Sequence, residues 1–283
     1  MPSESPYERD YSFEFFPPRS PDAEKQLSGT AENLAELHPL FFSVTFGAGG
    51  TTRQKTRETV IELKQRTGIE SAPHISCIGS TRSGILRIIQ DYRDQGIRRI
   101  VALRGDLPSG MMEVGEFRYA NELVEFIRAE TGDYFHIDVA AYPEMHPQAP
   151  NIEADLKNFK RKVEAGANGA ITQYFYNADA YFRFVDSCGK AGLDVPIVPG
   201  IMPIGNFFQI SRFSEACGAE IPRWMRKRFE YFADNRESVL AFGVDAISML
   251  CQNLLDSGAP GIHFYTMNRS ELVRKIWDRL DIR

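Results

Sequence analysis

The sequence has few cysteines, no excess of basic residues and no long apolar run. Its four cysteines, Cys77, Cys188, Cys217 and Cys251, form no C-x-x-C pair and no zinc-ligand spacing. Scattered thiols in a chain of 283 residues are typical of a reducing compartment. The net charge of −5 lacks the basic footprint of a nucleic-acid-binding protein. These absences argue against a disulfide scaffold, a metal site and a nucleic-acid partner, and they favour a small-molecule ligand.

Membrane and export signals are also missing from the sequence. No stretch approaches the roughly 18 consecutive apolar residues of a transmembrane helix. The first residues, MPSESPYERD, are polar and acidic, unlike a signal or transit peptide. We therefore expect a cytoplasmic protein with no membrane partner. Because no linker, repeat or low-complexity tract interrupts the chain, we expect one domain over residues 1–283.

Short β-rich segments alternate with amphipathic helical segments along the chain. Eight segments have the composition of strands and are bounded by glycine, proline or polar residues. Eight strand–helix units favour a (β/α)₈ TIM barrel of the α/β class. A doubly wound sheet is the competing architecture, but no dinucleotide-binding fingerprint is present. The predicted strands are 12–16, 41–46, 72–77, 98–104, 135–142, 169–175, 196–201 and 261–266.

Amphipathic periodicity predicts the helices, and the clearest covers residues 236–257. Val239, Phe242 and Ala246 belong to its apolar stripe, and Gly258 with Pro260 should end it. The long connection between the seventh and eighth strands also holds a helical segment at 221–232, so extra helices are expected there. The other predicted helices are 22–36, 53–66, 82–95, 117–130, 152–165, 178–190 and 269–280.

Active sites of such barrels lie at the carboxyl ends of the strands, where Glu14 is the sharpest signal. Period two places Ser12, Glu14 and Phe16 on one face of the first strand. A carboxylate among the phenyl rings of Phe13 and Phe15 loses solvation, which disfavours its charged form. Glu14 is therefore a candidate general acid. An ion pair with a basic residue at the strand end is the alternative.

Two other strand ends carry candidate ligand contacts. Arg104, Gly105 and Asp106 close the fourth strand, and glycine there permits close approach of a ligand to the backbone. A turn with a local ion pair is the alternative. His74 and Cys77 should face opposite sides of their strand, which argues against a shared metal. His74 could still donate a hydrogen bond to a ligand.

Two segments could contact phosphate. The glycine-rich residues 47–52 could cradle a phosphate on backbone N–H groups, although they match no nucleotide-binding pattern and a tight turn is favoured. The run Lys160, Arg161 and Lys162 lies on a predicted helix. A solvated charged face is the usual interpretation of such a run, and a diphosphate site is the alternative.

Nine segments occur in an order that is typical of one family. They include S-F-E-F-F-P-P-R, S-V-T-F-G-A-G-G, I-V-A-L-R-G-D-L-P, A-A-Y-P-E-M-H-P and H-F-Y-T-M-N-R. Through them the chain, from about Ser12 to Arg279, resembles bacterial methylenetetrahydrofolate reductase. The resemblance implies a barrel that binds FAD non-covalently and uses NADH or NADPH. It implies ping-pong reduction of 5,10-methylenetetrahydrofolate to 5-methyltetrahydrofolate, which supplies methyl groups for methionine synthesis, and it implies a homo-oligomer.

The resemblance also assigns roles to individual residues. Glu14 would be the general acid that opens the imidazolidine ring, and the charge of Asp106 would favour the resulting cation. Phe213 would stack on either substrate, and Phe46 stands where relatives often carry tyrosine. The folate or nicotinamide contacts would be Asp106, Gln173, Gln209, Phe213 and Arg269. The FAD contacts would be Thr45, Phe46, His74, Arg104, Gly105, Asp106, Tyr119, Ala120, Tyr142, His146, Ala149, Asp155, Asn158, Arg161 and Lys162.

Three other classes of protein compete with this interpretation. A related flavin barrel, such as a proline dehydrogenase, would not need Glu14. A pterin-binding barrel that transfers methyl groups or only binds folate would need no flavin. A flavin-free lyase or aldolase barrel usually has a Schiff-base lysine or a metal site at its mouth, and the sequence indicates neither.

Overall fold

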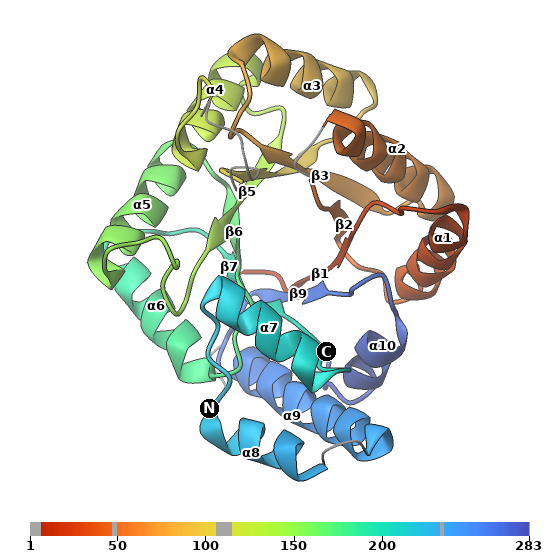
Figure 1. Ribbon diagram of the computed structural model, residues 1–283. Coiled ribbons are helices and arrows are strands. Elements are labelled where there is room, and N and C mark those ends of the chain that lie inside the picture. Colours follow the sequence, from red (N-terminus) through yellow and green to blue (C-terminus); the bar gives the residue numbers. More distant parts are fainter. Residues whose placement is uncertain (1–6, 47–49, 106–114, 233–234, 283) are drawn as a thin grey trace.

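Parallel strands form one barrel-shaped sheet in the computed structural model, which describes residues 7–46, 50–105, 115–232 and 235–282. The strand order is β7-β6-β5-β4-β3-β2-β1-β9-β8, and Figure 1 shows the surrounding ring of helices. The expected TIM barrel is confirmed. The strands are β1 (Asp10–Phe15), β2 (Phe41–Val44), β3 (Glu70–Ser76), β4 (Arg99–Leu103), β5 (His136–Ala141), β6 (Gly169–Thr172), β7 (Ile197–Val198), β8 (Gly200–Ile201) and β9 (Gly261–Tyr265).

The predicted seventh strand is divided at Pro199 into β7 and β8. β7 pairs with β6, whereas β8 pairs with β9. Proline has no N–H to donate to a sheet ladder, so the strand breaks there. The carbonyl of Pro199 still accepts a hydrogen bond from the N–H of His263 at 3.0 Å. The two short strands together therefore close the barrel between β6 and β9.

The predicted helices lie outside the barrel close to their expected positions, and α8 is the extra helix predicted at 221–232. α7 is a further extra helix before β9, which none of the predicted ranges covered. α4 begins later than predicted, because Tyr119 is its N-cap residue. α10 is shorter than predicted at both ends. The helices are α1 (Pro21–Ala35), α2 (Gly50–Thr67), α3 (Arg82–Asp94), α4 (Ala120–Thr131), α5 (Ile152–Glu164), α6 (Ala178–Lys190), α7 (Phe207–Cys217), α8 (Arg223–Phe232), α9 (Arg236–Asp256) and α10 (Glu271–Trp277).

Alternation along the strands divides the core into an outer and an inner layer. Phe13 and Phe15 are fully buried in the large cluster between sheet and helices. Phe41 and Val101 belong to a smaller cluster with Ala72 and Ile171. Because successive strand residues face opposite sides, the residues between the outward phenylalanines of β1 must point into the barrel.

α9 meets the length and apolarity criteria for a membrane span, contrary to the expectation that no segment would. It has 21 residues, and 56% of its most apolar window is buried inside the protein. Val239, Ala246 and Ile247 are among its buried residues, as the periodicity predicted. A helix that packs its apolar stripe in this way is typical of a protein core.

Candidate active site

A cavity of about 390 Å³ opens at the carboxyl ends of the strands. This volume is within the range of small-molecule sites, about 300–1,000 Å³. Predicted site residues from six strands meet there: Glu14, Thr45, Phe46, His74, Gly105, Tyr142 and Gln173. The remaining lining residues are mostly apolar: Ser76, Val101, Leu103, Ala140, Ile171, Met202 and Tyr265. The cavity therefore combines apolar walls with a few convergent polar groups.

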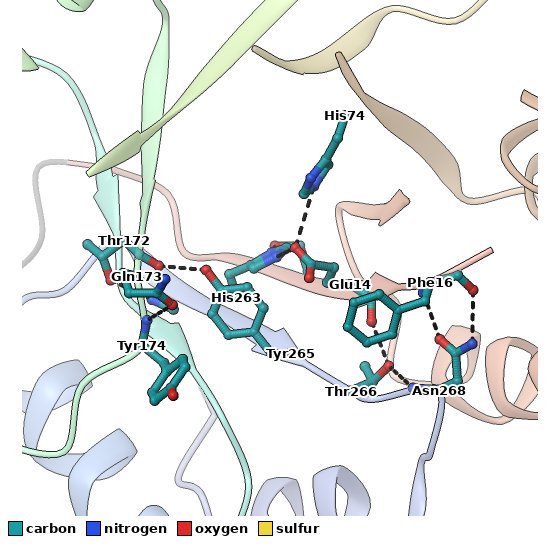
Figure 2. Close-up of polar contacts among 12 residues, drawn as sticks. Glu14, Phe16, His74, Thr172, Gln173, Tyr174, His263, Tyr265, Thr266 and Asn268 are labelled. Carbon is teal, nitrogen blue, oxygen red and sulfur yellow. Dashed lines mark hydrogen bonds and ion pairs between the residues drawn. The ribbon is translucent and has the colours of Figure 1, made fainter. Parts of the chain in front are cut away.

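Glu14 points into the barrel and lies between two imidazole rings (Figure 2). Its side chain is 9% exposed, and its Oε2 atom lies 3.4 Å from Nε2 of His74 and 3.7 Å from Nε2 of His263. The phenyl rings of Phe13 and Phe15, which the sequence suggested as its neighbours, lie on the outer face of β1. The two imidazoles, not the phenyl rings, are therefore the groups that can affect the proton of Glu14.

His74 is a buried neighbour of Glu14. Burial lowers the pKa of His74, although the charge of Glu14 acts in the opposite direction. Cys77 lies in the outer core cluster, so the two side chains face opposite sides as expected. Within the described part of the chain, no cluster of histidine, cysteine, aspartate and glutamate could hold a metal ion.

His263 of β9 is a site residue that sequence reasoning missed. It is fully buried, and its Nδ1 lies 2.7 Å from Oγ of Ser12. The sequence carried a signal for it, since period two in β9 places His263 and Tyr265 on one face. The Tyr265 hydroxyl donates to the carbonyl of Thr172 at 2.7 Å (Figure 2).

Gln173 presents its amide group at the end of β6. Its Oε1 accepts a hydrogen bond from the backbone N–H of Tyr174 at 3.0 Å. The Tyr174 hydroxyl lies 3.2 Å from Oγ of Ser214 in α7. This contact attaches α7 to the β6 side of the barrel mouth, and Figure 1 shows α7 in front of the strands.

Arg104 and Gly105 follow β4 at the wall of the cavity. Nη1 of Arg104 donates to Oε1 of Gln148 at 2.6 Å, whereas its buried Nε has no hydrogen-bond partner among the described residues. Gly105 has a φ of +79°, and a Cβ there would lie 1.8 Å from Oγ of Ser76. Only glycine fits this position. Asp106, the next predicted residue, lies outside the described residues.

The segment between β5 and α5 is tied together by side-chain contacts. The Tyr142 and His146 rings meet edge to face, with centroids 4.5 Å apart. The carboxylate of Asp155 accepts a hydrogen bond from the N–H of His146 at 2.8 Å, and the carbonyl of His146 accepts one from the N–H of Ala149. The predicted contacts Tyr142, His146, Ala149 and Asp155 are therefore neighbours in the structure.

The basic run of α5 does not form one surface, because its three cations point in different directions. Nζ of Lys162 donates to the carbonyl of Ala140, which lies beside the cavity. Burial lowers the pKa of Lys162 to about 8, although Asp155 opposes this. Arg161 is exposed and donates to Asn158 at 3.3 Å. Lys160 instead donates to the carbonyl of Ala191 beyond α6.

The other predicted contacts lie around the rim, outside the residues that line the cavity. Tyr119 and Ala120 are at the start of α4, and Tyr119 is 55% exposed. Gln209 and Phe213 lie one turn apart on α7, where Phe213 is 38% exposed. Arg269 follows β9, and its N–H donates to the carbonyl of Thr266. These residues could contact only the outer part of a ligand in the cavity.

The chain matches one protein family over nearly its whole length. Residues 4–281 match the family described as methylenetetrahydrofolate reductase. The chain is 45% identical to the 5,10-methylenetetrahydrofolate reductase of Salmonella typhimurium over 274 residues, which cover 96% of this chain and 90% of that protein. The protein of the same name from Escherichia coli is 44% identical with the same coverage. The resemblance seen in the sequence motifs is confirmed.

Solved structures show the same fold at low sequence identity. An uncharacterized protein from Clostridium thermocellum, which binds two copies of 5-methyl-5,6,7,8-tetrahydrofolic acid, has a TM-score of 0.65 and 16% identity, with 97% of this chain and 95% of that chain covered. Oxaloacetate acetylhydrolase has a TM-score of 0.53 and 11% identity, with 91% and 75% covered. Family match, relatives and fold agree: the chain belongs to the methylenetetrahydrofolate reductase family of oxidoreductases.

Proposed function

We propose that the protein reduces 5,10-methylenetetrahydrofolate to 5-methyltetrahydrofolate in a ping-pong reaction with NADH or NADPH through non-covalently bound FAD. The observation that carries this proposal is the buried carboxylate of Glu14, set between two imidazoles at the wall of the strand-end cavity. Family membership supports the choice of folate as the substrate. In this role the protein supplies methyl groups for methionine synthesis in the cytoplasm.

The described residues fit a flat, heteroaromatic cofactor such as the flavin. Val101, Leu103 and Ile171 offer apolar walls, while Arg104 has a buried Nε without a hydrogen-bond partner. When bound, FAD would accept a hydride from the nicotinamide and later supply it to the folate. Thr45, His74 and the other contacts implied by the resemblance would hold it. Lys162, which reaches inward, and Arg161, which is exposed at the side of α5, would hold the diphosphate from two directions.

Proton transfer is the part of the reaction that this chain performs directly. Glu14 donates a proton to the substrate nitrogen that leaves when the imidazolidine ring opens, which makes the one-carbon unit a cation that accepts a hydride. Apolar walls limit water around the carboxyl, so the proton is delivered to the substrate. Asp106 stabilises the cation by its negative charge. Gln173, Gln209, Phe213 and Arg269 bind the folate or the nicotinamide, which use the site in turn.

The experiment that tests this function is an anaerobic visible spectrum of the purified protein. Flavin absorption should bleach on addition of NADH and return on addition of methylenetetrahydrofolate. Bleaching without return would contradict the folate assignment and leave a flavin reductase. A protein that shows no flavin absorption, even after FAD is added, would contradict the cofactor assignment and favour a pterin-binding or lyase barrel.

Glu14→Gln separates the two half-reactions. The variant should keep its flavin and its reduction by NADH, because neither needs the proton of Glu14. Reduction of methylenetetrahydrofolate should slow by about 10²–10⁴-fold, the usual contribution of a general acid. Stopped-flow absorption measures both steps.

Glu144→Gln is the matched control for this substitution. Glu144 is another half-buried carboxylate near the mouth, where it accepts a hydrogen bond from the N–H of Glu220 at 2.9 Å. Both half-reactions should persist in this variant. Normal folate reduction by Glu14→Gln would contradict the general-acid role.

A further inference from the structure

Ser12, His263 and Glu14 form a chain of side chains along the inside of the barrel. Oγ of Ser12 lies 2.7 Å from Nδ1 of His263, and Nε2 of the same ring lies 3.7 Å from Oε2 of Glu14. β1 and β9 are paired so that Ser12 is opposite His263 in the register. The order of groups matches a serine–histidine–acid triad. Here, however, the serine is 1% exposed and the acid lines the cavity, so the reacting end is Glu14.

The surroundings of Ser12 determine which nitrogen of His263 carries the proton. Within the described part of the chain, His263 is the one hydrogen-bond partner of the Ser12 hydroxyl. If Nδ1 carried the proton, it would donate to Oγ and the buried hydroxyl proton would have no acceptor. A buried donor without a partner loses its hydrogen bonds to water and gains nothing in exchange. With the hydroxyl as donor to Nδ1, the proton of His263 lies on Nε2, which has no hydrogen-bond partner in the described structure and faces Oε2 of Glu14 at 3.7 Å.

His74, the other imidazole beside Glu14, has no such contact with a serine among the described residues. Its ring borders the cavity. The ring of His263 is enclosed by Phe41, at a centroid distance of 6.0 Å, and by Tyr265 at 5.3 Å. The Tyr265 hydroxyl is used by Thr172, so it does not compete for Glu14. Glu14 thus has one imidazole that is tied to Ser12 and a second, His74, at the wall of the cavity.

We propose that Ser12 and His263 are positioning residues, which hold an Nε2–H donor on the Glu14 carboxylate that remains after its proton has been given to the substrate. The inference rests on the proposed general-acid role of Glu14. A hydrogen bond from Nε2 requires the distance of 3.7 Å to shorten on substrate binding, as catalytic hydrogen bonds often do. Besides His74, the charged groups in electrostatic range are Asp138 of β5 and, through it, Arg99 of β4. The donor strengthens Glu14 as an acid without adding a charge.

Two substitutions of His263 distinguish this role from simple packing. The amide nitrogen of glutamine can replace Nε2, whereas that of asparagine can replace only Nδ1. We measure the rate of folate reduction against pH in His263→Gln and His263→Asn, with flavin reduction by NADH as the internal reference. Glutamine should preserve the wild-type profile. Asparagine should lower the low-pH plateau about tenfold and move the half-rate point up by about one pH unit, since one charge-assisted hydrogen bond is lost.

Ser12 is tested through its dependence on His263. Ser12→Ala should shift the pH profile in the same direction as His263→Asn, but by less. Ser12→Thr, which keeps a hydroxyl, should retain the wild-type profile. In the double variant, Ser12→Ala should cause no shift beyond that of His263→Asn alone. Ser248→Ala is the control, because it removes a buried hydroxyl of α9 without a hydrogen-bond partner in the described structure. Equal profiles for the glutamine and asparagine variants would overturn the inference.

A spectroscopic readout is independent of catalysis. Nitrogen-15 NMR of the purified protein, labelled at its five histidines, reports the tautomer of each ring. The His263 signal, assigned by its loss in His263→Gln, should show the proton on Nε2. A proton on Nδ1 would overturn the inference. A wild-type protein that cannot reduce methylenetetrahydrofolate would contradict the proposed function instead, and the tautomer would still test the geometry.

Discussion

Single residues at the barrel mouth have conformations that no other residue type could adopt. Gly105 is the clearest case, since it has positive φ and passes close to Ser76. Its backbone also brings Arg104 to a position where the carbonyl accepts hydrogen bonds from Oγ of Ser76 and from the N–H of Ile78, both at 2.9 Å. The wall of the cavity thus depends on a residue without a side chain.

Gly105→Ala should therefore destabilise the protein. A Cβ placed 1.8 Å from Oγ of Ser76 forces the loop or β3 to move, in addition to the strain of positive φ. We expect a loss of about 1–3 kcal/mol in the free energy of unfolding, measured by urea denaturation. Gly189→Ala in α6 is the control, because nothing lies within 4 Å of its added Cβ. Gly189→Ala should stabilise the protein by about 0.5–1 kcal/mol. Equal effects of the two substitutions on the free energy of unfolding would be inconsistent with a clash at Gly105.

At the scale of the element, α5 shows how one helix distributes its charges. Asn151 caps its first turn by accepting from the N–H of Ala154, and Asp155 anchors the preceding loop. Lys162 then reaches inward to a strand carbonyl, while Lys160 and Arg161 reach to the sides. Of the three basic residues, Lys162 therefore points into the barrel wall, while Lys160 and Arg161 point to either side.

The inward cation predicts how FAD affinity should depend on pH. The pKa of Lys162 is lowered to about 8 by burial, and a bound diphosphate would favour the protonated amine. Below pH 8 the Lys162 amine is already protonated, so the affinity for FAD is at its maximum. Above pH 8 a proton must be taken up, so affinity should fall as pH rises towards 9.5, by about tenfold.

Flavin fluorescence titrations of two helix variants measure this effect. Lys162→Met should bind FAD more weakly than the wild type at pH 7, and its affinity should no longer fall between pH 8 and 9.5. Lys160→Met should keep the wild-type pH dependence, since its side chain faces α6. The same decline in Lys162→Met as in the wild type would show that another group causes it.

The whole molecule is a barrel with one reactive end and one sealed end. On the amino-terminal side, Arg99 lies 3.7 Å from Asp138 and stacks over the Phe41 ring at 4.2 Å. Phe41 in turn stacks on His263, so its ring contacts both Arg99 and His263. Burial opposes the charge of Asp138, but His136 and Arg99 outweigh it and lower its pKa. The stabilisation by these charges is thus present above the ordinary value of 3.8 and lost as pH falls below it.

Breaking this pair should destabilise the entire fold. Arg99→Met leaves the buried charge of Asp138 with His136 as its remaining partner and should cost about 3 kcal/mol in the free energy of unfolding. Adding Asp138→Asn should recover part of that loss. Arg98→Met is the control, because Arg98 is exposed and stacks on Tyr134 at 4.0 Å, and it should cost less than about 1 kcal/mol. Additive effects of the double variant would contradict a coupled pair.

Local patterns in the sequence were sufficient to predict the barrel and the end that carries the site. Strand and helix periodicities arise from contacts within a few residues, and the parallel arrangement then brings every strand end to one face. Glu14, His74 and Gln173 could therefore be placed together from their positions alone. Ser12 could also be assigned to the side of β1 that Glu14 faces.

The tertiary structure alone decided which side chains meet across the barrel. Ser12 and His263 are 251 positions apart, and their contact depends on the register of β1 with β9. The division of the seventh strand at Pro199, the diverging directions of the α5 cations and the replacement of phenyl rings by imidazoles around Glu14 also follow from closure. A local pattern determines which face a residue takes, but only the closed sheet determines what lies opposite it, because that depends on the packing of the whole core.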